Sequence, residues 1–188
     1  SRRRETKETR ADNSDDPSYP PGKTQDMLDF AYFGGIYRDC WMIVHNDVYI
    51  TDPNFENETA GGGLFISYGD VSEEKAEVNL GIHVRNSSGK SFSGRVECQL
   101  YNRNQELVGK IQKKVTLSGG KARQTDGKMT VENPMLWSPD SPYLYTLNVY
   151  VKDASGNIVD GYSRRVGIRS IEFKGKDGFW LNGKPYPE

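Results

Sequence analysis

Closely spaced carboxylates are the first residues in this chain whose type could do chemistry. Hydrolysis of a glycosidic bond, for example, uses two carboxyl groups about 5–9.5 Å apart. Three pairs of neighbouring acids come into question: Asp15 and Asp16, Glu56 and Glu58, and Glu73 and Glu74. All of them lie in polar loops, where solvated carboxylates are the usual state, and closeness in sequence does not create that spacing across a substrate. We therefore predict that none of them is catalytic.

The two histidines, His45 and His83, offer no better candidate for a reactive site. Neither has a His or Cys partner at a spacing typical of a metal site. Strand alternation places His83 on a solvent-facing side, whereas His45 shares a strand side with Trp41 and Ile43. We interpret both as ordinary surface or packing residues.

The two cysteines, Cys40 and Cys98, are too few for a disulfide scaffold and lack a CxxC spacing. Alternation puts Cys98 on the same strand face as Val96 and Leu100. We predict that both thiols are buried apolar groups without a reactive or metal-binding role.

Composition excludes several classes of function. The 188 residues include 25 Lys and Arg against 26 Asp and Glu, a net charge of -1, so the chain as a whole attracts neither nucleic acid nor an anionic membrane. Apolar runs fall far short of the roughly 20 residues that span a bilayer, and the charged amino terminus lacks the apolar core of a signal peptide. We expect a soluble chain, and its compartment stays unknown.

Short strands are the elements that would position these side chains. Beyond Gly63, runs of alternating apolar residues are separated by turn residues, and no stretch has convincing helical spacing. The runs are 64–68, 76–85, 94–102, 107–117, 128–132, 144–152 and 158–168. About seven such strands in roughly 100 residues predict an all-β fold, an immunoglobulin-like β-sandwich of antiparallel strands with an N-terminal extension.

The expected domain organisation places a boundary before this sandwich. Residues 1–52 combine an aperiodic charged tail with aromatic and β-branched residues from Phe30 onward, which suit the terminal strands of another domain. Residues 53–63 are expected to be a linker. The Gly61-Gly62-Gly63 run within it lacks the lysine and the following helix of a phosphate loop.

A second boundary is expected after the sandwich. Residues 64–170 would form the sandwich itself, and Trp137 within it is interpreted as a structural ring at the sandwich end. Residues 171–188 would begin a further β unit, with Asn182-Gly183 as a type I′ hairpin signal.

Two segments resemble glycoside hydrolase family 2, and specifically its β-galactosidases. The first, Leu28-Asp29-Phe30-Ala31-Tyr32-Phe33-Gly34-Gly35-Ile36-Tyr37-Arg38-Asp39, resembles the end of the family's sugar-binding jelly-roll domain. The second is Asn-Pro-Met-Leu-Trp-Ser-Pro-Asp-Ser-Pro-Tyr-Leu-Tyr at 133–145, continued by Arg-Val-Gly-Ile-Arg at 165–169 and Phe-Trp-Leu-Asn-Gly-Lys-Pro at 179–185. It resembles the last strands of the sandwich domain and the entry to a catalytic barrel.

The resemblance implies a parent enzyme built from a jelly roll, an immunoglobulin-like sandwich and a (β/α)₈ barrel. The barrel would carry two glutamates that hydrolyse terminal β-galactosides with retention. Residues 1–52 would then be the tail and terminal strands of a truncated jelly roll, and 171–188 the start of the connection into an absent barrel. Asn57-Glu58 does not match the family's Gly-Asn-Glu context, because Glu56 precedes it. No catalytic residue is carried over, so the chain alone is expected to be a non-catalytic scaffold whose partners are those two domains.

One residue, Asp29, matches an aspartate that contacts galactose and a sodium ion in related β-galactosidases. A carboxylate can accept sugar hydroxyls or ligate a hard cation through oxygen. The resemblance therefore implies a substrate-binding and possible sodium-ligating role for Asp29 in the parent, which could use Mg²⁺ or Na⁺, while the chain alone is expected to hold no cofactor. The other interpretation is a loop-capping aspartate.

Three alternatives stay open. The parent could be a β-glucuronidase, although Asp39 favours a galactosidase because the glucuronidase branch tends to have proline there. The chain could also be a free-standing carbohydrate-binding or surface-adhesion sandwich, since exposed rings near Tyr32 could stack on sugars. Finally, an exposed strand edge within residues 30–50 could pair two copies into a homodimer.

Overall fold

The computed structural model describes Ser18, Met27, Asp39 and the ranges 43–56, 58–59 and 61–186. The chain divides into two compact units, Ser1–Val44 and His45–Glu188. Asp29, Cys40 and the aromatic cluster near Tyr32 lie outside the described residues, so the predictions made for them stay predictions.

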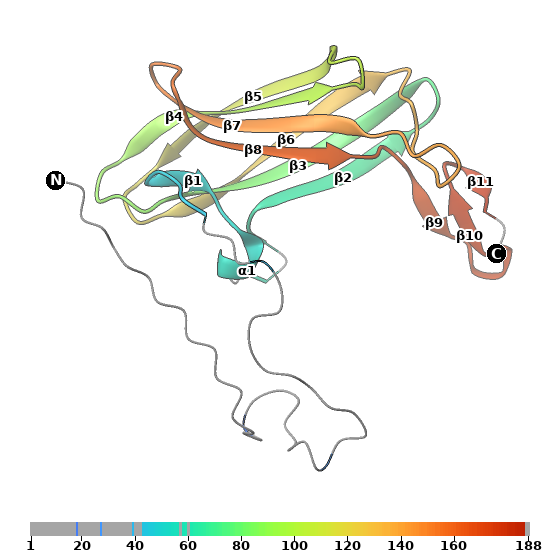
Figure 1. Cartoon of the computed structure of the whole chain (residues 1–188), viewed down its shortest axis with the longest axis horizontal. Coiled ribbons are helices and arrows are strands. Elements are labelled where there is room, and N and C mark those ends of the chain that lie inside the picture. The colour runs from blue at the N-terminus through green and yellow to red at the C-terminus, as the bar shows by residue number, and fades with distance from the viewer. Residues whose placement is uncertain are drawn as a thin grey trace. The chain divides into compact units, whose positions relative to one another are not determined.

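The first sheet of the second unit is centred on its longest strand (Figure 1). β3 pairs along one edge with β6, in an unbroken register from Lys75 opposite Glu132 to Arg85 opposite Ala122. Its other edge is shared by β2 and the short β1, which pair with different parts of β3. The strands are β1 (Val48–Ile50), β2 (Leu64–Val71), β3 (Lys75–Asn86) and β6 (Ala122–Glu132).

The second sheet contains four antiparallel strands in the order β5-β4-β7-β8. They are β4 (Phe92–Tyr101), β5 (Leu107–Leu117), β7 (Tyr145–Asp153) and β8 (Ile158–Val166). Because β5 and β6 follow one another in the chain but belong to different sheets, their connection passes from one sheet to the other. The all-β sandwich expected from the sequence is confirmed.

The core lies between the two sheets and is filled by the apolar face of each strand. β3 contributes Val78, Leu80, Ile82 and Val84, the four residues that alternation predicted on one face, and all are buried. Cys98 is fully buried beside Val96 and Leu100, as predicted. Burial is the main cause and the charge of Glu97 a further cause of the raised pKa of its thiol, about 12. At neutral pH this cysteine is therefore a protonated core residue.

The bounds of most strands agree with those predicted from the alternation of apolar and polar residues, and one strand differs. β5 spans 107–117 as expected, whereas β6 begins at Ala122 and not at residue 128. The first half of β6 carries Arg123, Gln124 and Asp126, which hide the alternation although the backbone pairs with β3 throughout. Pairing to a central strand thus extends β6 into a polar segment.

A three-stranded hairpin unit follows the sandwich. β9 (Ile171–Phe173), β10 (Phe179–Leu181) and β11 (Lys184–Pro185) form a sheet in the order β11-β10-β9, and the 3₁₀ turn η2 (Gly175–Asp177) lies between β9 and β10. Asn182 and Gly183 have φ values of 52° and 73°, as the predicted type I′ turn requires. No helix in the described part of the chain is long and apolar enough to cross a membrane.

Residues 45–52 pack with the sandwich. β1 places Val48 opposite Asn86 and Ile50 opposite Val84. The backbone N–H of Ile50 also donates to Oδ2 of Asp160 in β8, at 2.7 Å. Through these bonds β1 contacts both sheets, so the division between the units falls at Val44 and His45, earlier than the boundary expected after residue 52.

The segment expected to be a linker is a loop within the sandwich unit, since β1 and β2 both pair with β3. It contains one helical turn, α1 (Pro53–Glu56). Asp52 caps this turn by accepting hydrogen bonds from the backbone N–H groups of Asn54 and Phe55. A capping aspartate followed by proline at the first helical position explains why a single turn forms here without helical periodicity.

Candidate functional site

The loop between β1 and β2 brings Glu56 and Glu58 to the outer side of β3. Glu56 does not lie in solvent as predicted, because its side chain is only 7% exposed and accepts hydrogen bonds from Nε and Nη2 of Arg85. Glu58 is about half-exposed and lies 3.7 Å from Nε2 of His83. The prediction of a solvated carboxylate is therefore wrong for Glu56 and holds for Glu58.

His83 is buried, with 5% of its surface exposed, which corrects the prediction that it faces solvent. The loop covers it: Oγ1 of Thr51 lies 2.9 Å from its Nδ1, and the backbone N–H of Thr51 donates to its carbonyl. The backbone N–H of Gly63 donates to Oγ1 of Thr51 at 2.8 Å. His83 thus helps hold the loop in place, and strand alternation alone could not reveal the covering segment.

Glu56, Glu58 and His83 form a group whose ligand atoms all lie within 4.8 Å of one another. Both hydrogen bonds from Arg85 go to the Glu56 carboxylate, which brings a fixed positive charge to the same place. Hard cations such as Mg²⁺ prefer oxygen-only ligand sets, which an imidazole does not match. We assign the group a structural role, and it does not fit the sodium or magnesium implied by the family resemblance.

The outer face of the second sheet is organised around Glu97, whose carboxylate is 3% exposed. Nζ of Lys152 lies 3.1 Å from it, Nζ of Lys110 lies 3.6 Å away, and the amides of Gln99 and Gln112 each donate to it at 2.5 Å. Burial disfavours the charge, but the hydrogen bonds and positive charges outweigh burial and lower the pKa of Glu97. We call this surface, formed by Glu97 and these four partners, the filled face.

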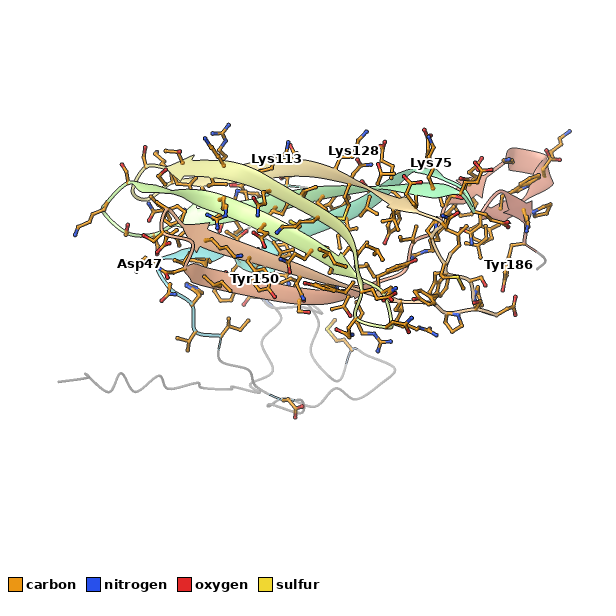
Figure 2. All side chains as sticks on the ribbon, turned by 90° about the horizontal axis from the view of Figure 1, so that it is seen from above. Asp47, Lys75, Lys113, Lys128, Tyr150 and Tyr186 are labelled. Carbon is orange, nitrogen blue, oxygen red and sulfur yellow. The ribbon has the colours of Figure 1, made fainter. Side chains whose placement is uncertain are left out.

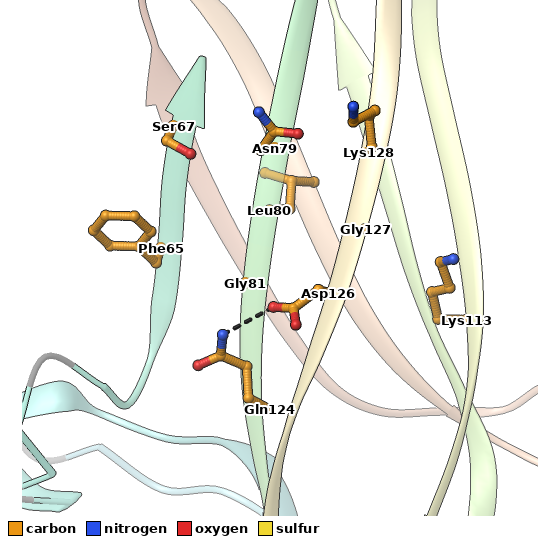
Figure 3. A pocket seen from close by; sticks show the side chains of 10 residues that line it. All are labelled: Phe65, Ser67, Asn79, Leu80, Gly81, Lys113, Gln124, Asp126, Gly127 and Lys128. Carbon is orange, nitrogen blue, oxygen red and sulfur yellow. Dashed lines mark hydrogen bonds between the residues drawn. The ribbon is translucent and has the colours of Figure 1, made fainter. Parts of the chain in front are cut away.

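The outer face of the first sheet is open by comparison (Figure 3). Phe65, Gly81 and Asp126 lie in register across β2, β3 and β6, and Ser67, Asn79 and Lys128 form the next row. Together with Gln124 and with Lys113 from β5, they line a hollow of about 400 Å³. We call the surface formed by these eight residues the open face.

Two side chains of β6 cover the floor of the open face at Gly81. A Cβ added there would come 3.1 Å from Nε2 of Gln124 and 3.4 Å from Oδ1 of Asp126. These two side chains bridge above the glycine, since the Gln124 amide donates to Asp126 at 2.8 Å. At one end of the hollow, Phe65 is 67% exposed. The arrangement has the parts of a binding surface, with a free ring, an amide, a carboxylate and lysine ammonium groups.

A second hollow, of about 600 Å³, lies where β2 ends near the hairpin unit, and Asp70, Arg169 and Glu172 are among its lining residues. Oε2 of Glu172 lies 3.4 Å from Nζ of Lys174. Arg169 stacks over the ring of Trp137 at 5.1 Å, and the Trp137 backbone bonds to Ile168. These contacts agree with the structural role predicted for Trp137.

Among the other predicted sites, His45 lies on the surface and stacks on Tyr49 at 3.6 Å. Glu73 is exposed and lies 3.4 Å from Lys184, in line with the prediction of a solvated acid. Sequence reasoning missed the open face entirely. The available signal was the polar residues Gln124, Asp126 and Lys128, which occupy every second position of β6. Phe65 and Gly81 belong to other strands and become their neighbours only in the sheet.

Residues 63–169, the sandwich described above, match the family model of Glycosyl hydrolases family 2. The chain belongs to this family. The match confirms the resemblance to glycoside hydrolase family 2, and it covers β2 to β8 together with the Trp137 segment.

Two curated members of the family are similar to most of the chain. The Beta-galactosidase of Thermoanaerobacter pseudethanolicus is 28% identical over 160 residues, which are 85% of this chain and 19% of that protein. The Beta-glucuronidase of Formosa agariphila is 27% identical over 152 residues, 80% of this chain and 15% of that protein.

Among solved family 2 structures, the putative beta-galactosidase from Bacteroides fragilis superposes with a TM-score of 0.77 at 28% identity. That match covers 94% of this chain and 25% of the other. The chain thus spans a quarter or less of the length of each of these three relatives.

Proposed function

We propose that this chain is a non-catalytic scaffold module of a β-galactosidase-type glycoside hydrolase. The sandwich would space and orient the jelly roll and the barrel of the same parent polypeptide, which hydrolyses terminal β-galactosides through two barrel glutamates. The supporting observation is that the family match at residues 63–169 coincides with a sandwich whose interior is filled by apolar side chains. Such an interior supplies rigidity and not a reaction chamber.

The carboxylates of the described residues support this scaffold proposal. A retaining glycosidase needs a nucleophile and an acid/base about 5–5.5 Å apart on either side of the bond to be cleaved. Glu56 and Glu97 are bound by cationic side chains, and Glu172 lies beside Lys174. The hydrogen bonds and lysines around Glu97 lower its pKa, so this carboxylate is held as an anion and is a poor proton donor at neutral pH.

The purified 188-residue chain tests the scaffold proposal with chromogenic aryl β-galactoside and aryl β-glucuronide. We expect no release of nitrophenol above the rate of buffer alone. If release occurs, the double variants Glu56→Gln/Glu58→Gln and Asp70→Asn/Glu172→Gln show whether this chain is responsible. A rate that falls in either variant would overturn the proposal, whereas a contaminating enzyme would act equally in all preparations.

In the parent enzyme we propose that Asp29 contacts the galactoside and ligates a sodium ion, and that Mg²⁺ or Na⁺ supports activity there. A carboxylate oxygen suits both roles. Replacing Asp29 with Asn in the full-length parent should raise KM for an aryl galactoside and weaken the dependence of activity on Na⁺. Unchanged values of both would assign Asp29 a loop-capping role instead.

A second candidate for the parent is a β-glucuronidase, and the relative of that name in Formosa agariphila supports it. The two activities differ in the carboxylate that a glucuronide carries at C6, where a galactoside has a hydroxymethyl group. Comparing kcat/KM of the full-length parent for the two aryl glycosides decides between them. A higher value for the glucuronide would replace the galactosidase proposal.

The rival proposal of a free-standing carbohydrate-binding sandwich makes a different prediction. Calorimetric titration of the chain with galactose or lactose should show no heat of binding if the chain is a scaffold. Saturable binding of either sugar would favour the rival. Light scattering addresses the possible homodimer in the same sample, because a monomeric mass would exclude strand-edge pairing between copies.

A further inference from the structure

We propose that the open face binds an acidic glycan chain, that is, a polysaccharide carrying carboxylate groups. This inference rests on the proposed function only for the choice of a sugar polymer as the partner. The argument for a binding surface comes from the ring at one end of the hollow, the polar groups along its floor and the positive charge at its other end.

The ring of Phe65 is free to stack on a sugar. Gly81 lies opposite it on β3, yet the atoms nearest to a Cβ added at Gly81 belong to Gln124 and Asp126. In Figure 3 the ring points away from β3, toward the outside of β2. The apolar faces of pyranose rings pack against exposed aromatic rings of this kind.

The floor of the hollow offers hydrogen-bonding groups at the level of the sheet. Gly81 has no side chain, and the Gln124 and Asp126 side chains bridge above it, so the polar groups that a ligand meets between Phe65 and β6 are theirs. The Asp126 carboxylate accepts one bond from Gln124 and keeps lone pairs for sugar hydroxyls, while the Asn79 amide, which donates to Glu77, keeps its oxygen as an acceptor. Sugars, with a hydroxyl on most carbons, match such a mixed set.

Positive charge gathers beyond the floor, on the edge formed by β5 and β6. Residues 107–128 contain six Lys and Arg and one acid, Asp126, although Lys110 among them belongs to the filled face, where it lies 3.6 Å from Glu97. Lys113 and Lys128 line the hollow itself, and Figure 2 shows them on one side of the sandwich together with Lys75. The ammonium group of Lys128 lies 2.6 Å from Glu77, whereas Lys113 is exposed.

The dimensions fit a chain of sugars and not a single ring. Neighbouring strands of one sheet lie about 4.8 Å apart, so the span from Phe65 on β2 across β3 to β6 is about 10 Å, and Lys113 lies beyond it on β5 of the other sheet. A sugar stacked on Phe65 therefore could not reach Lys113 with its own carboxylate. An extended acidic glycan could place one residue on the ring and the carboxylate of another beside the lysines.

Nucleic acid fits the same surface less well. Asp126 lies in the middle of the hollow, where it would repel a phosphate backbone but can accept a hydroxyl. The net charge of -1 also gives no long-range attraction of the kind that draws proteins to nucleic acid. A glycan with widely spaced carboxylates tolerates this mixture of charges.

Chromatography of the 188-residue chain on immobilised polygalacturonate tests the proposal. We expect retention at low salt and elution by about 0.2 M NaCl, because exposed ion pairs are screened at that ionic strength. Phe65→Ala should weaken binding about two- to tenfold and Lys113→Gln/Lys128→Gln roughly tenfold. The matched control Lys174→Gln/Lys176→Gln removes the same charge from the hairpin unit and should leave retention unchanged.

Three results would overturn the proposal. They are no retention of the unmodified 188-residue chain, a loss of retention in the control variant equal to that in Lys113→Gln/Lys128→Gln, and equal retention of the unmodified chain on immobilised duplex DNA. Phe65 and Lys113 are exposed, so their variants should fold, and thermal unfolding of each variant verifies this before chromatography. Failure here would leave the scaffold proposal intact, because that proposal depends on the hydrolysis assay.

Discussion

Two glycines in this sandwich lie opposite an aromatic residue on a neighbouring strand, and the two rings are placed differently. Gly161 on β8 faces Tyr150 on β7, and a Cβ added there would meet the Tyr150 ring at 3.3 Å. Gly81 faces Phe65, but its nearest neighbours are Gln124 and Asp126. In one sheet the ring lies against its glycine, and in the other the ring is left to solvent.

The same contrast extends to the charged groups of the two outer faces. On the filled face, lysines and amides converge on the buried carboxylate of Glu97. On the open face, Asp126 is exposed and has one amide partner, and Lys113 is exposed. Polar groups that satisfy one another stabilise the sheet, whereas groups left partly unsatisfied remain available to a ligand.

Replacing the central carboxylate of each face should give the largest difference in stability between a variant of the filled face and a variant of the open face. Glu97→Ala leaves Lys152 and two glutamine amides without their buried acceptor and should lower the free energy of unfolding by about 2–4 kcal/mol. Asp126→Ala should change it by less than about 0.5 kcal/mol. Urea unfolding followed by tryptophan fluorescence measures both. Equal losses would mean that the open face is as structural as the filled face.

Removing the aromatic rings of Tyr150 and Phe65 should give the next largest difference in stability between the two faces. Tyr150→Ala exposes Gly161 and removes a half-buried ring, so we expect a loss of about 1–2 kcal/mol. Phe65→Ala should cost less than about 0.5 kcal/mol, because its ring is already largely solvated. The same unfolding assay applies, and a large loss for Phe65→Ala would show that its ring supports the sheet.

The pH dependence of stability sharpens the account of Glu97. Its pKa is lowered in the folded state, so its charge stabilises the fold above the unfolded value of about 4.3, and this contribution is lost as pH falls through the folded pKa. The Glu97→Gln variant should therefore have a lower free energy of unfolding than the unmodified chain at pH 7. This difference in free energy should become smaller below about pH 4. The exposed Glu73→Gln serves as the control. A difference that does not narrow would assign the effect to packing.

The smallest expected effects on stability come from replacing each of the two glycines with alanine. Gly161→Ala should cost about 0.5–1 kcal/mol because the Tyr150 ring must shift from its added Cβ. Gly81→Ala meets only the ends of flexible side chains and gains strand propensity, so its stability should change by less than about 0.5 kcal/mol. Thermal unfolding of the two variants under the same conditions tests this order. The reverse order would indicate that the floor of the open face is tightly packed.

Alternation along single strands predicted the sandwich and its core well. The spacing of Val78, Leu80 and Ile82 identified the buried face of β3, and the same argument placed Cys98 in the core. These predictions succeed because one buried face imposes a period of two on the residues of each strand.

The features that the sequence did not predict depend on contacts between distant segments. The burial of His83 requires Thr51 to fold over it, and the burial of Glu56 requires Arg85 to lie beneath the loop. The start of β6 at Ala122 is set by backbone pairing with β3 and not by its own polar side chains. Periodicity within one strand contains no information about which partner will cover its polar face.

The loop between β1 and β2 closes on itself at His83. The backbone N–H of Thr51 bonds to the His83 carbonyl, and the backbone N–H of His83 bonds to the carbonyl of Gly63. Both ends of the loop are thereby fixed to one residue of the central strand, so the length of the segment between them does not affect the strand register. The sandwich thus has a point where evolution or an engineer could insert residues without changing the two sheets, provided that Thr51, His83 and Gly63 are kept.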